Sequence, residues 1–158
     1  MLADGSPFKQ ARADDCAGFL LWKLTALWQR RLAAVFDEAG ITQTQFAILA
    51  SLRWFADHDQ PTTQTVLAEH ARIEPMTLSK AIRKLGASGL VIRGPAASDS
   101  RAVAVRLSAK GRKLTQRVVI AVENADDTFF GRLGERDLAA FKALTMALVD
   151  GGSESGQP

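Results

Sequence analysis

The sequence predicts a mainly α-helical fold with one small β-hairpin, and three stretches lead to this prediction. A helical segment, TQTVLAEHA (63–71), is followed after a tight turn by a second, PMTLSKAIRKLGA (75–87). Two strand-like runs then flank the turn-rich segment GPAASDS (94–100). The order helix, turn, helix, hairpin is that of a winged helix-turn-helix. The first expectation is therefore a protein that binds DNA, and not an enzyme.

Length and composition limit the alternatives. A chain of 158 residues forms one domain, or one domain with a dimerisation appendage, and 47% hydrophobic residues are enough for a core. No run of about 18 apolar residues suggests a membrane span, and the polar N-terminus has no apolar stretch typical of a secretory signal. The single cysteine, Cys16, excludes an intramolecular disulfide and suits a reducing compartment, so we expect a cytoplasmic protein.

The charge of the chain is distributed unevenly. Residues 60–113 contain ten Lys/Arg and three Asp/Glu, a formal charge of +7, whereas the rest of the chain carries −4. A basic centre between acidic ends is typical of a surface that faces phosphates. Charge alone leaves open the alternative that these residues only solvate helix faces.

The N-terminal part is predicted to be a flexible segment, 1–13, followed by dimerisation and scaffold helices within 14–58. A long helix from 15 to about 39 is apolar on two faces, so it should contact both its own subunit and a partner. Its apolar positions are Phe19, Leu20, Trp22, Leu24, Ala26, Leu27, Trp28, Leu32, Ala33 and Val35. Gly40 ends it, and Thr42 with Gln45 forms a capping box for a helix over 43–56.

The DNA-binding region is predicted to span 59–112. Thr63 caps its first helix, with Val66, Leu67 and Ala71 facing inward. The second helix begins at Pro75, buries Leu78, Ile82 and Leu85, and ends before Gly89, with Leu90 packing back over its end. Strands are expected over 90–93 and 102–107.

The C-terminal part should contain two more helices. Ser108 is expected to cap a helix over 109–130, and a last helix covers 135–149. Residues 113–149 are predicted to form the C-terminal dimerisation region. The segment 150–158 is polar and rich in glycine, so it is predicted to be a disordered tail.

The outward positions of the second helix are the predicted base and phosphate contacts, because the recognition helix presents its N-terminal residues to base edges. These positions are Pro75, Met76, Thr77, Ser79, Lys80, Arg83 and Lys84. Ser79 lies nearest the core side, and Glu74 places an unfavourable charge at a helix N-terminus otherwise open to phosphate. The wing is expected to bind through Arg93, Asp99, Arg101 and Arg106. Arg101 suits a narrow minor groove, although an Asp99–Arg101 turn ion pair would account for both residues as well.

These motifs resemble the MarR (multiple antibiotic resistance regulator) family over about 15–149. The resemblance rests on GITQTQFAILASL, on the Leu-Val-x-Arg strand, on the Asp-x-Arg of the hairpin and on the Leu-Ser-x-x-Gly that follows it. It implies a homodimer with interlocked terminal helices that binds a pseudo-palindromic operator. It also implies repression, relieved by a small aromatic or anionic ligand or by cysteine oxidation.

The residues suggest two candidate sensing sites. Phe19, Trp22 and Phe46 are the candidates for an aromatic ligand pocket, although aromatics at helical spacing also suit a core or an interface. Cys16 is a candidate redox residue, but the chain has no tyrosine to hold a thiolate as in the peroxide-sensing branch, and Asp14 and Asp15 oppose thiolate formation. An ordinary semi-buried cysteine is the alternative. No metal site or cofactor is expected.

Three functions remain open. The first is a dimeric repressor released by a ligand, the second is a repressor switched by oxidation of Cys16, and the third is an interaction protein that keeps the fold without specific DNA binding. Arg101 and the basic centre argue against the third. No base-orienting group or oxyanion loop supports catalysis.

Overall fold

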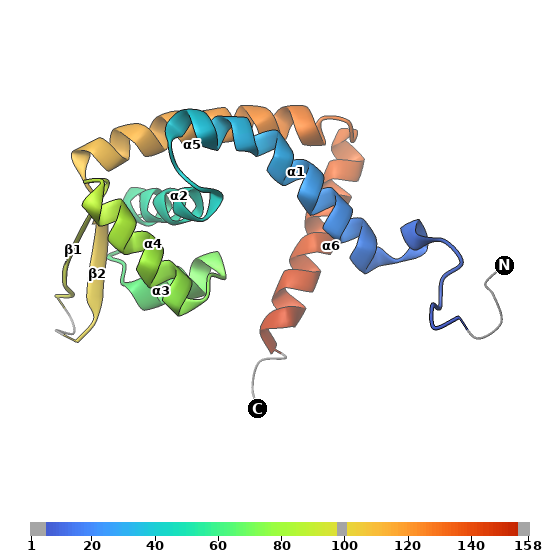
Figure 1. Ribbon diagram of the computed structural model, residues 1–158, viewed down its shortest axis with the longest axis horizontal. Helices are drawn as coiled ribbons and strands as arrows, with labels where there is room; N and C mark the ends of the chain where they lie inside the picture. Colours follow the sequence, from blue (N-terminus) through green and yellow to red (C-terminus); the bar gives the residue numbers. More distant parts are fainter. Residues whose placement is uncertain (1–5, 98–100, 155–158) are drawn as a thin grey trace. The chain divides into compact units, whose positions relative to one another are not determined.

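The computed structural model describes residues 6–97 and 101–154 and confirms the predicted fold class (Figure 1). The elements are a 3₁₀ turn (Ala13–Asp15), α1 (Ala17–Ala39), α2 (Gln43–Asp57), α3 (Gln64–Ala71), α4 (Pro75–Ala87), β1 (Val91–Pro95), β2 (Val103–Leu107), α5 (Ala109–Phe130) and α6 (Glu135–Glu154). The chain divides into two compact units, residues 1–122 and 123–158, which are described separately.

The predicted caps set the boundaries of α1, α2 and α3. Gly40 ends α1 in the left-handed region at φ 67°, where a side chain would be strained. The Thr42 hydroxyl accepts from the Gln45 N–H at 3.1 Å, and the Gln45 side chain accepts from the Thr42 N–H at 2.9 Å. Thr63 accepts from the Val66 N–H at 3.3 Å. Thr42 and Thr63 satisfy backbone donors, and Gly40 satisfies backbone carbonyls, that the helices themselves leave without partners.

A Schellman motif ends α4 and determines where the hairpin begins. Gly89, at φ 72°, donates its N–H to the Gly86 carbonyl at 2.9 Å, and Leu90 donates to the Leu85 carbonyl at 2.9 Å. Leu90 is buried over the helix end, as predicted. Its N–H is used by this motif, so β1 starts at Val91 and not at Leu90.

The core of unit 1 is formed by side chains of the C-terminal half of α1, of α2 to α5 and of the hairpin. Its largest fully buried members are Leu32, Ile48, Leu49, Leu67, Leu78, Ile82, Leu85 and Thr115. One inward position in α3 was predicted wrongly. Val66 is exposed, and Ala68 is buried beside Leu67 instead. Residues 67, 68 and 71 lie on one helix face, whereas residue 66 lies at its edge.

The hairpin is tied to the segment before α3. β1 and β2 pair antiparallel with Val91 opposite Leu107 and Pro95 opposite Val103. The Val105 N–H donates to the Thr62 carbonyl at 3.0 Å, and Thr63 forms a β-bridge with Ala104. The helix-turn-helix and the base of the wing are therefore joined by backbone hydrogen bonds as well as by apolar contacts.

The start of α5 lies against the end of α4. The Ser108 hydroxyl accepts from the Gly111 N–H at 2.9 Å and donates to the Gly89 carbonyl at 2.6 Å. The Ser108 N–H donates to the Leu90 carbonyl at 3.0 Å. A Cβ at Gly111 would overlap that same carbonyl oxygen, so only glycine permits this approach.

Unit 2 contains the end of α5, a turn and α6. Phe130 packs on Phe141 with ring centroids 5.6 Å apart. The last helix, predicted to end at residue 149, continues to Glu154, which corrects the start of the predicted disordered tail. Residues 155–158 lie outside the described residues, so disorder there stays a prediction. The apolar pattern of α6 stops at Val149, but hydrogen bonds along the backbone do not require that pattern, so periodicity locates a helix end poorly. Across residues 6–97 and 101–154, no helix combines the length and hydropathy needed to cross a bilayer.

Two glycines on either side of the α4–α5 junction should respond oppositely to the same substitution. Gly111→Ala should lower the free energy of unfolding by about 1–3 kcal/mol, because the new methyl group overlaps the Leu90 carbonyl. Gly86→Ala should raise it by about 0.5–1 kcal/mol, because Gly86 lies inside α4 with nothing within 4 Å of its added Cβ. Urea unfolding at one protein concentration measures both, and equal effects of the two substitutions would contradict this packing.

Candidate nucleic-acid interface

One face of α4 is buried and the opposite face is exposed. Leu78, Ala81, Ile82 and Leu85 face the core. Nearly all the predicted recognition residues are exposed, with Ser79 half-buried as its position nearer the core suggested. The exposed ones are Pro75, Met76, Thr77, Lys80, Arg83 and Lys84. This face offers one hydroxyl, three cations and one thioether, the groups needed for phosphate contacts, base edges and a thymine methyl.

The N-terminus of α4 is not open to phosphate, which corrects the expectation for this site. The Glu74 carboxylate accepts from the backbone N–H of Met76 at 2.9 Å and of Thr77 at 2.8 Å, so it caps its own helix. These two hydrogen bonds, Met76 first, hold the pKa of Glu74 below its ordinary value of 4.5. A charged carboxylate at this position repels a phosphate, but it can accept from the amino group of cytosine or adenine.

The turn between α3 and α4 contains a strained residue. Arg72 ends α3 at φ 51°, in the left-handed region that non-glycine residues rarely adopt. The N–H of Ile73 donates to the Ala68 carbonyl at 3.1 Å and closes the turn. Such strain costs about 1 kcal/mol and persists only where the surrounding structure enforces it. The turn thereby fixes the direction in which α4 leaves α3.

The two strand arginines of the wing lie on opposite faces of the hairpin. Arg93 is paired with Val105, and Arg106 is paired with Ile92, and paired residues share a face. Since 105 and 106 are adjacent in one strand, their side chains point to opposite sides. Arg93 and Arg106 are both exposed. Together they can contact phosphates on two sides of the wing but not the same phosphate.

The wing tip is described only in part. Arg101 is exposed at the start of the turn that leads into β2. Asp99, the other predicted residue of the tip, lies outside the described residues, so the proposed bracing of Arg101 by Asp99 stays a prediction.

The three residues of the predicted aromatic pocket lie in two separate aromatic contacts. Phe19 and Trp22 contact each other near the start of α1, with ring centroids 6.0 Å apart. Phe46 packs on Phe36 at 5.2 Å, and Phe36 lies 17 residues after Phe19 in the same helix. That separation is about 25 Å along the axis. The described chain therefore does not bring Phe19 and Trp22 together with Phe46, and a ligand pocket formed by the three stays a prediction.

Cys16 occupies the N-cap position of α1 and is exposed, where a semi-buried thiol was the expected alternative. The 3₁₀ turn before it brings its N–H to the Ala13 carbonyl at 3.1 Å. Asp14 forms an ion pair with Lys23 at 2.7 Å. Exposure is compatible with oxidation, but no interaction of the thiol itself was found in the described residues, so redox sensing stays a prediction.

Comparisons with known proteins agree with this architecture. The model of the ArnR1-like winged-helix domain matches residues 37–124. The uncharacterized HTH-type transcriptional regulator YdcH of Bacillus subtilis is 32% identical over 113 residues, which are 72% of this chain and 77% of that protein.

Solved structures share the fold. A structure of Bordetella bronchiseptica BpsR, described by the regulation of its DNA binding by 6-hydroxynicotinic acid, superposes with a TM-score of 0.80 at 22% identity, covering 92% of this chain and 99% of that one. A cysteine-to-serine mutant of MarR from E. coli in complex with operator DNA superposes with a TM-score of 0.74 at 23% identity, covering 83% of this chain and 91% of that one.

The Glu74 cap should give stability a specific pH dependence. The pKa of Glu74 is lowered in the folded protein, so its ionised form contributes to the free energy of unfolding. This stabilisation is complete above about pH 4.5 and is lost as the pH falls through the lowered pKa. Glu74→Gln should therefore lower Tm at pH 7, with a difference from the wild type that shrinks below pH 4.5. Glu69→Gln, which removes an exposed charge from α3, is the control. Thermal unfolding between pH 7 and about pH 3 measures this, and a constant difference would refute the cap.

Proposed function

The chain belongs to the winged-helix, HTH-type transcriptional regulators, and from this premise we propose that it is a homodimeric repressor of the MarR type, released from a pseudo-palindromic operator by a small ligand. The observation that carries the proposal is the exposed polar and cationic face of α4, with the arginine-bearing hairpin beside it. Side chains of α4 would enter the major groove, and Arg101 would reach the minor groove.

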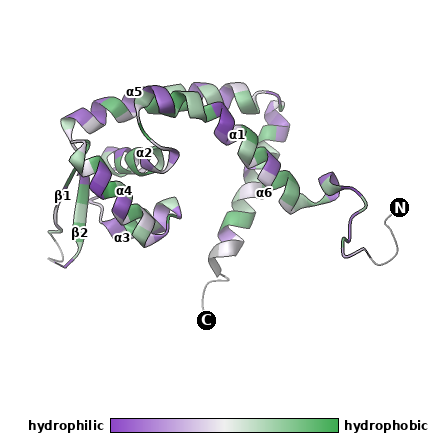
Figure 2. Cartoon of the chain, viewed as in Figure 1, coloured by the Kyte–Doolittle hydropathy of each residue, from purple (hydrophilic) through white to green (hydrophobic). Residues whose placement is uncertain are grey.

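The proposed dimer explains apolar side chains that one subunit leaves exposed. Figure 2 shows hydrophobic residues recurring along α1 and α6. On α1, Leu21 and Trp22 are 63% and 68% exposed; on α6, Leu144 and Leu148 are 70% and 78% exposed. Side chains of this size gain about 1.5–3 kcal/mol each when fully buried. Covering them by a second copy accounts for the two-faced pattern of α1.

Two-fold symmetry would explain how a small ligand could release the protein from DNA. A dimer that reads successive major grooves needs its recognition helices about 34 Å apart. A ligand that binds better to a dimer with a different spacing shifts the population away from DNA. The 6-hydroxynicotinic acid response of BpsR, which shares the fold, supports a small-molecule effector for this chain.

Specific DNA binding and its dependence on the wing can be tested together. Fluorescence anisotropy should show tight, sequence-selective binding to the intergenic DNA beside the protein's own gene, with a steep salt dependence. Arg101→Ala should weaken binding by about 1–3 kcal/mol and flatten the salt slope by about one unit. Arg136→Ala, which removes an exposed charge from α6, is the control.

Scrambled DNA separates specific binding from charge attraction. Equal affinity for scrambled and intergenic DNA would favour an interaction protein that keeps the fold. An unchanged affinity and salt slope in Arg101→Ala would overturn the proposal that the wing contacts DNA through Arg101. The proposal that α4 contacts the bases would still stand.

The dimer can be tested through its apolar surface. Leu144→Glu with Leu148→Glu should convert the dimer into monomers in sedimentation velocity, because two buried carboxylates without partners strongly oppose association. Val66→Glu is the matched control, because Val66 is also an exposed apolar residue but lies on α3. A double variant that still sediments as a dimer would show that this part of α6 is not in the interface.

A further inference from the structure

The carboxylate of Glu74 is held in one orientation at the start of α4. Its Oε1 accepts from the Met76 N–H at 2.9 Å, and its Oε2 accepts from the Thr77 N–H at 2.8 Å. An exposed glutamate without such bonds samples several rotamers, and ordering it in a complex costs free energy. Because Glu74 is already ordered in the free protein, its carboxylate can contact DNA without most of that cost.

The cap leaves this carboxylate able to accept more hydrogen bonds. An ionised carboxylate offers about four acceptor positions, and the two backbone N–H groups use one on each oxygen. Glu74 is exposed, and so are Met76 and Thr77 beside it. A base edge can therefore reach the remaining positions while the helix cap stays intact.

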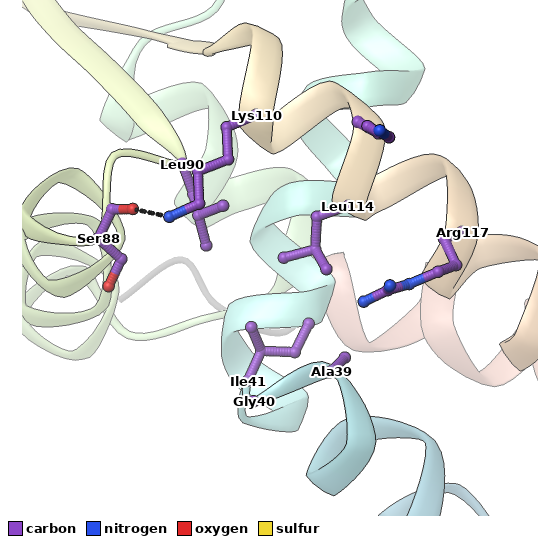
Figure 3. Close-up of a pocket in the computed structure, with 9 residues that line it drawn as sticks. Ala39, Gly40, Ile41, Ser88, Leu90, Lys110, Leu114 and Arg117 are labelled. Atoms are coloured by element: carbon purple, nitrogen blue, oxygen red, sulfur yellow. Dashed lines mark hydrogen bonds between the residues drawn. The ribbon is translucent and has the colours of Figure 1, made fainter.

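Both ends of α4 are anchored, which gives the carboxylate a defined place. At the N-terminal end, the Ile73 N–H donates to the Ala68 carbonyl at 3.1 Å and closes the turn from α3. At the C-terminal end, α4 borders an open pocket between α5 and the α1–α2 turn (Figure 3). There the Nζ of Lys110 donates to the carbonyl of Ser88, the C-cap of α4, at 2.9 Å. The helix that carries Glu74 is thus held in unit 1 by hydrogen bonds as well as by its buried face.

A cation lies near the same carboxylate. The hydrogen bonds from Met76 and Thr77 are the main causes that lower the pKa of Glu74, and the charge of Lys80 is the smallest. In the part of the chain that the structure describes, no ion pair joins Glu74 to Lys80. The exposed start of α4 therefore offers DNA an acceptor with a strong donor nearby.

The four bases differ in what their major-groove edges offer a carboxylate. Guanine presents two acceptors, and thymine presents one acceptor and a methyl group, so both repel it. Adenine presents its amino group beside the acceptor N7, whereas cytosine presents an amino group without an acceptor next to it. Cytosine is therefore the best match for the carboxylate. The guanine paired with that cytosine offers O6 and N7 to an ammonium group such as that of Lys80.

We propose that Glu74 is a specificity-determining residue, whose carboxylate accepts a hydrogen bond from the amino group of one cytosine in each operator half-site. One carboxylate then serves both as the helix cap and as the base contact, and Lys80 donates to the guanine of the same pair. This inference rests on the proposed function and adds the identity of a base to it. Because the carboxylate repels phosphates and the acceptors of wrong bases, it raises selectivity more than affinity.

Selection from random duplex DNA tests the base preference without an operator known in advance. The wild type should enrich sites with cytosine at one fixed position of each half-site. Glu74→Ser keeps a side chain that caps helices well but has no carboxylate. It should lose the preference for cytosine at that position and keep the preferences at the other positions. Glu69→Gln, which removes an exposed charge from α3, is the control and should keep the cytosine.

A base analogue tests the hydrogen bond itself. Replacing the selected cytosine by 2-pyrimidinone removes its amino group and should weaken wild-type binding by about tenfold in fluorescence anisotropy. The same replacement should change the affinity of Glu74→Ser much less. Comparing the four affinities in a double-mutant cycle cancels the effect of the analogue on the duplex, because that effect is common to both proteins.

A glutamate that only caps the helix gives a different result. Glu74→Ser would then change the affinity for all sequences by one factor and would still select the same cytosine. That outcome, wild-type sites without a fixed cytosine, or equal effects of the analogue on both proteins would overturn the inference and leave the proposed function standing. If the wild type enriches no sequence, the proposed function itself is refuted, and this inference with it.

Discussion

The close approach of the Leu90 carbonyl to Gly111 is the contact on which the arrangement of unit 1 depends. Leu90 ends the Schellman motif of α4 and precedes β1, while Gly111 lies in the first turn of α5. Ser108 holds the two segments together through Gly89 and Leu90. One backbone contact thus fixes the end of the recognition helix, the start of the wing and the direction of α5. It also explains the Leu-Ser-x-x-Gly motif, because serine supplies the hydrogen bonds and glycine supplies the space.

Most of the helix caps were predictable from the sequence, because a cap depends on a few adjacent residues. Thr42, Thr63, Ser108 and Gly89 act as expected, since each satisfies backbone groups within its own turn. The Glu74 cap was missed because aspartate, serine and threonine are the usual capping residues, and the glutamate was treated only as a charge. The signal was present in the sequence, since Glu74 directly precedes a proline that begins a helix.

Longer-range features could not be read from periodicity. The pattern of α1 predicted two apolar faces, but the described chain buries only Leu32 and Phe36 of this helix. Periodicity identifies a face without saying what covers it. The pocket between the end of α4 and α5 could not be predicted from the sequence for a similar reason. Lys110, Lys113 and Arg117 resemble ordinary solvated charges until the fold places Ile41 and Leu90 beside them. The spacing of these cations was visible in the sequence, but the pocket that they line depends on three-dimensional packing.

The backbone link between Thr62, Thr63 and β2 has a mechanical consequence. This segment pairs with β2 like a short third strand. The base of the wing therefore cannot rotate without breaking hydrogen bonds to the segment that leads into α3. The helix-turn-helix and the base of the wing therefore move as one rigid unit. In the proposed function, such a rigid unit would not adjust its internal geometry to an imperfect half-site, so the DNA would have to twist or bend to fit it. Discrimination would then extend to base pairs that no side chain touches, through the deformability of the operator itself.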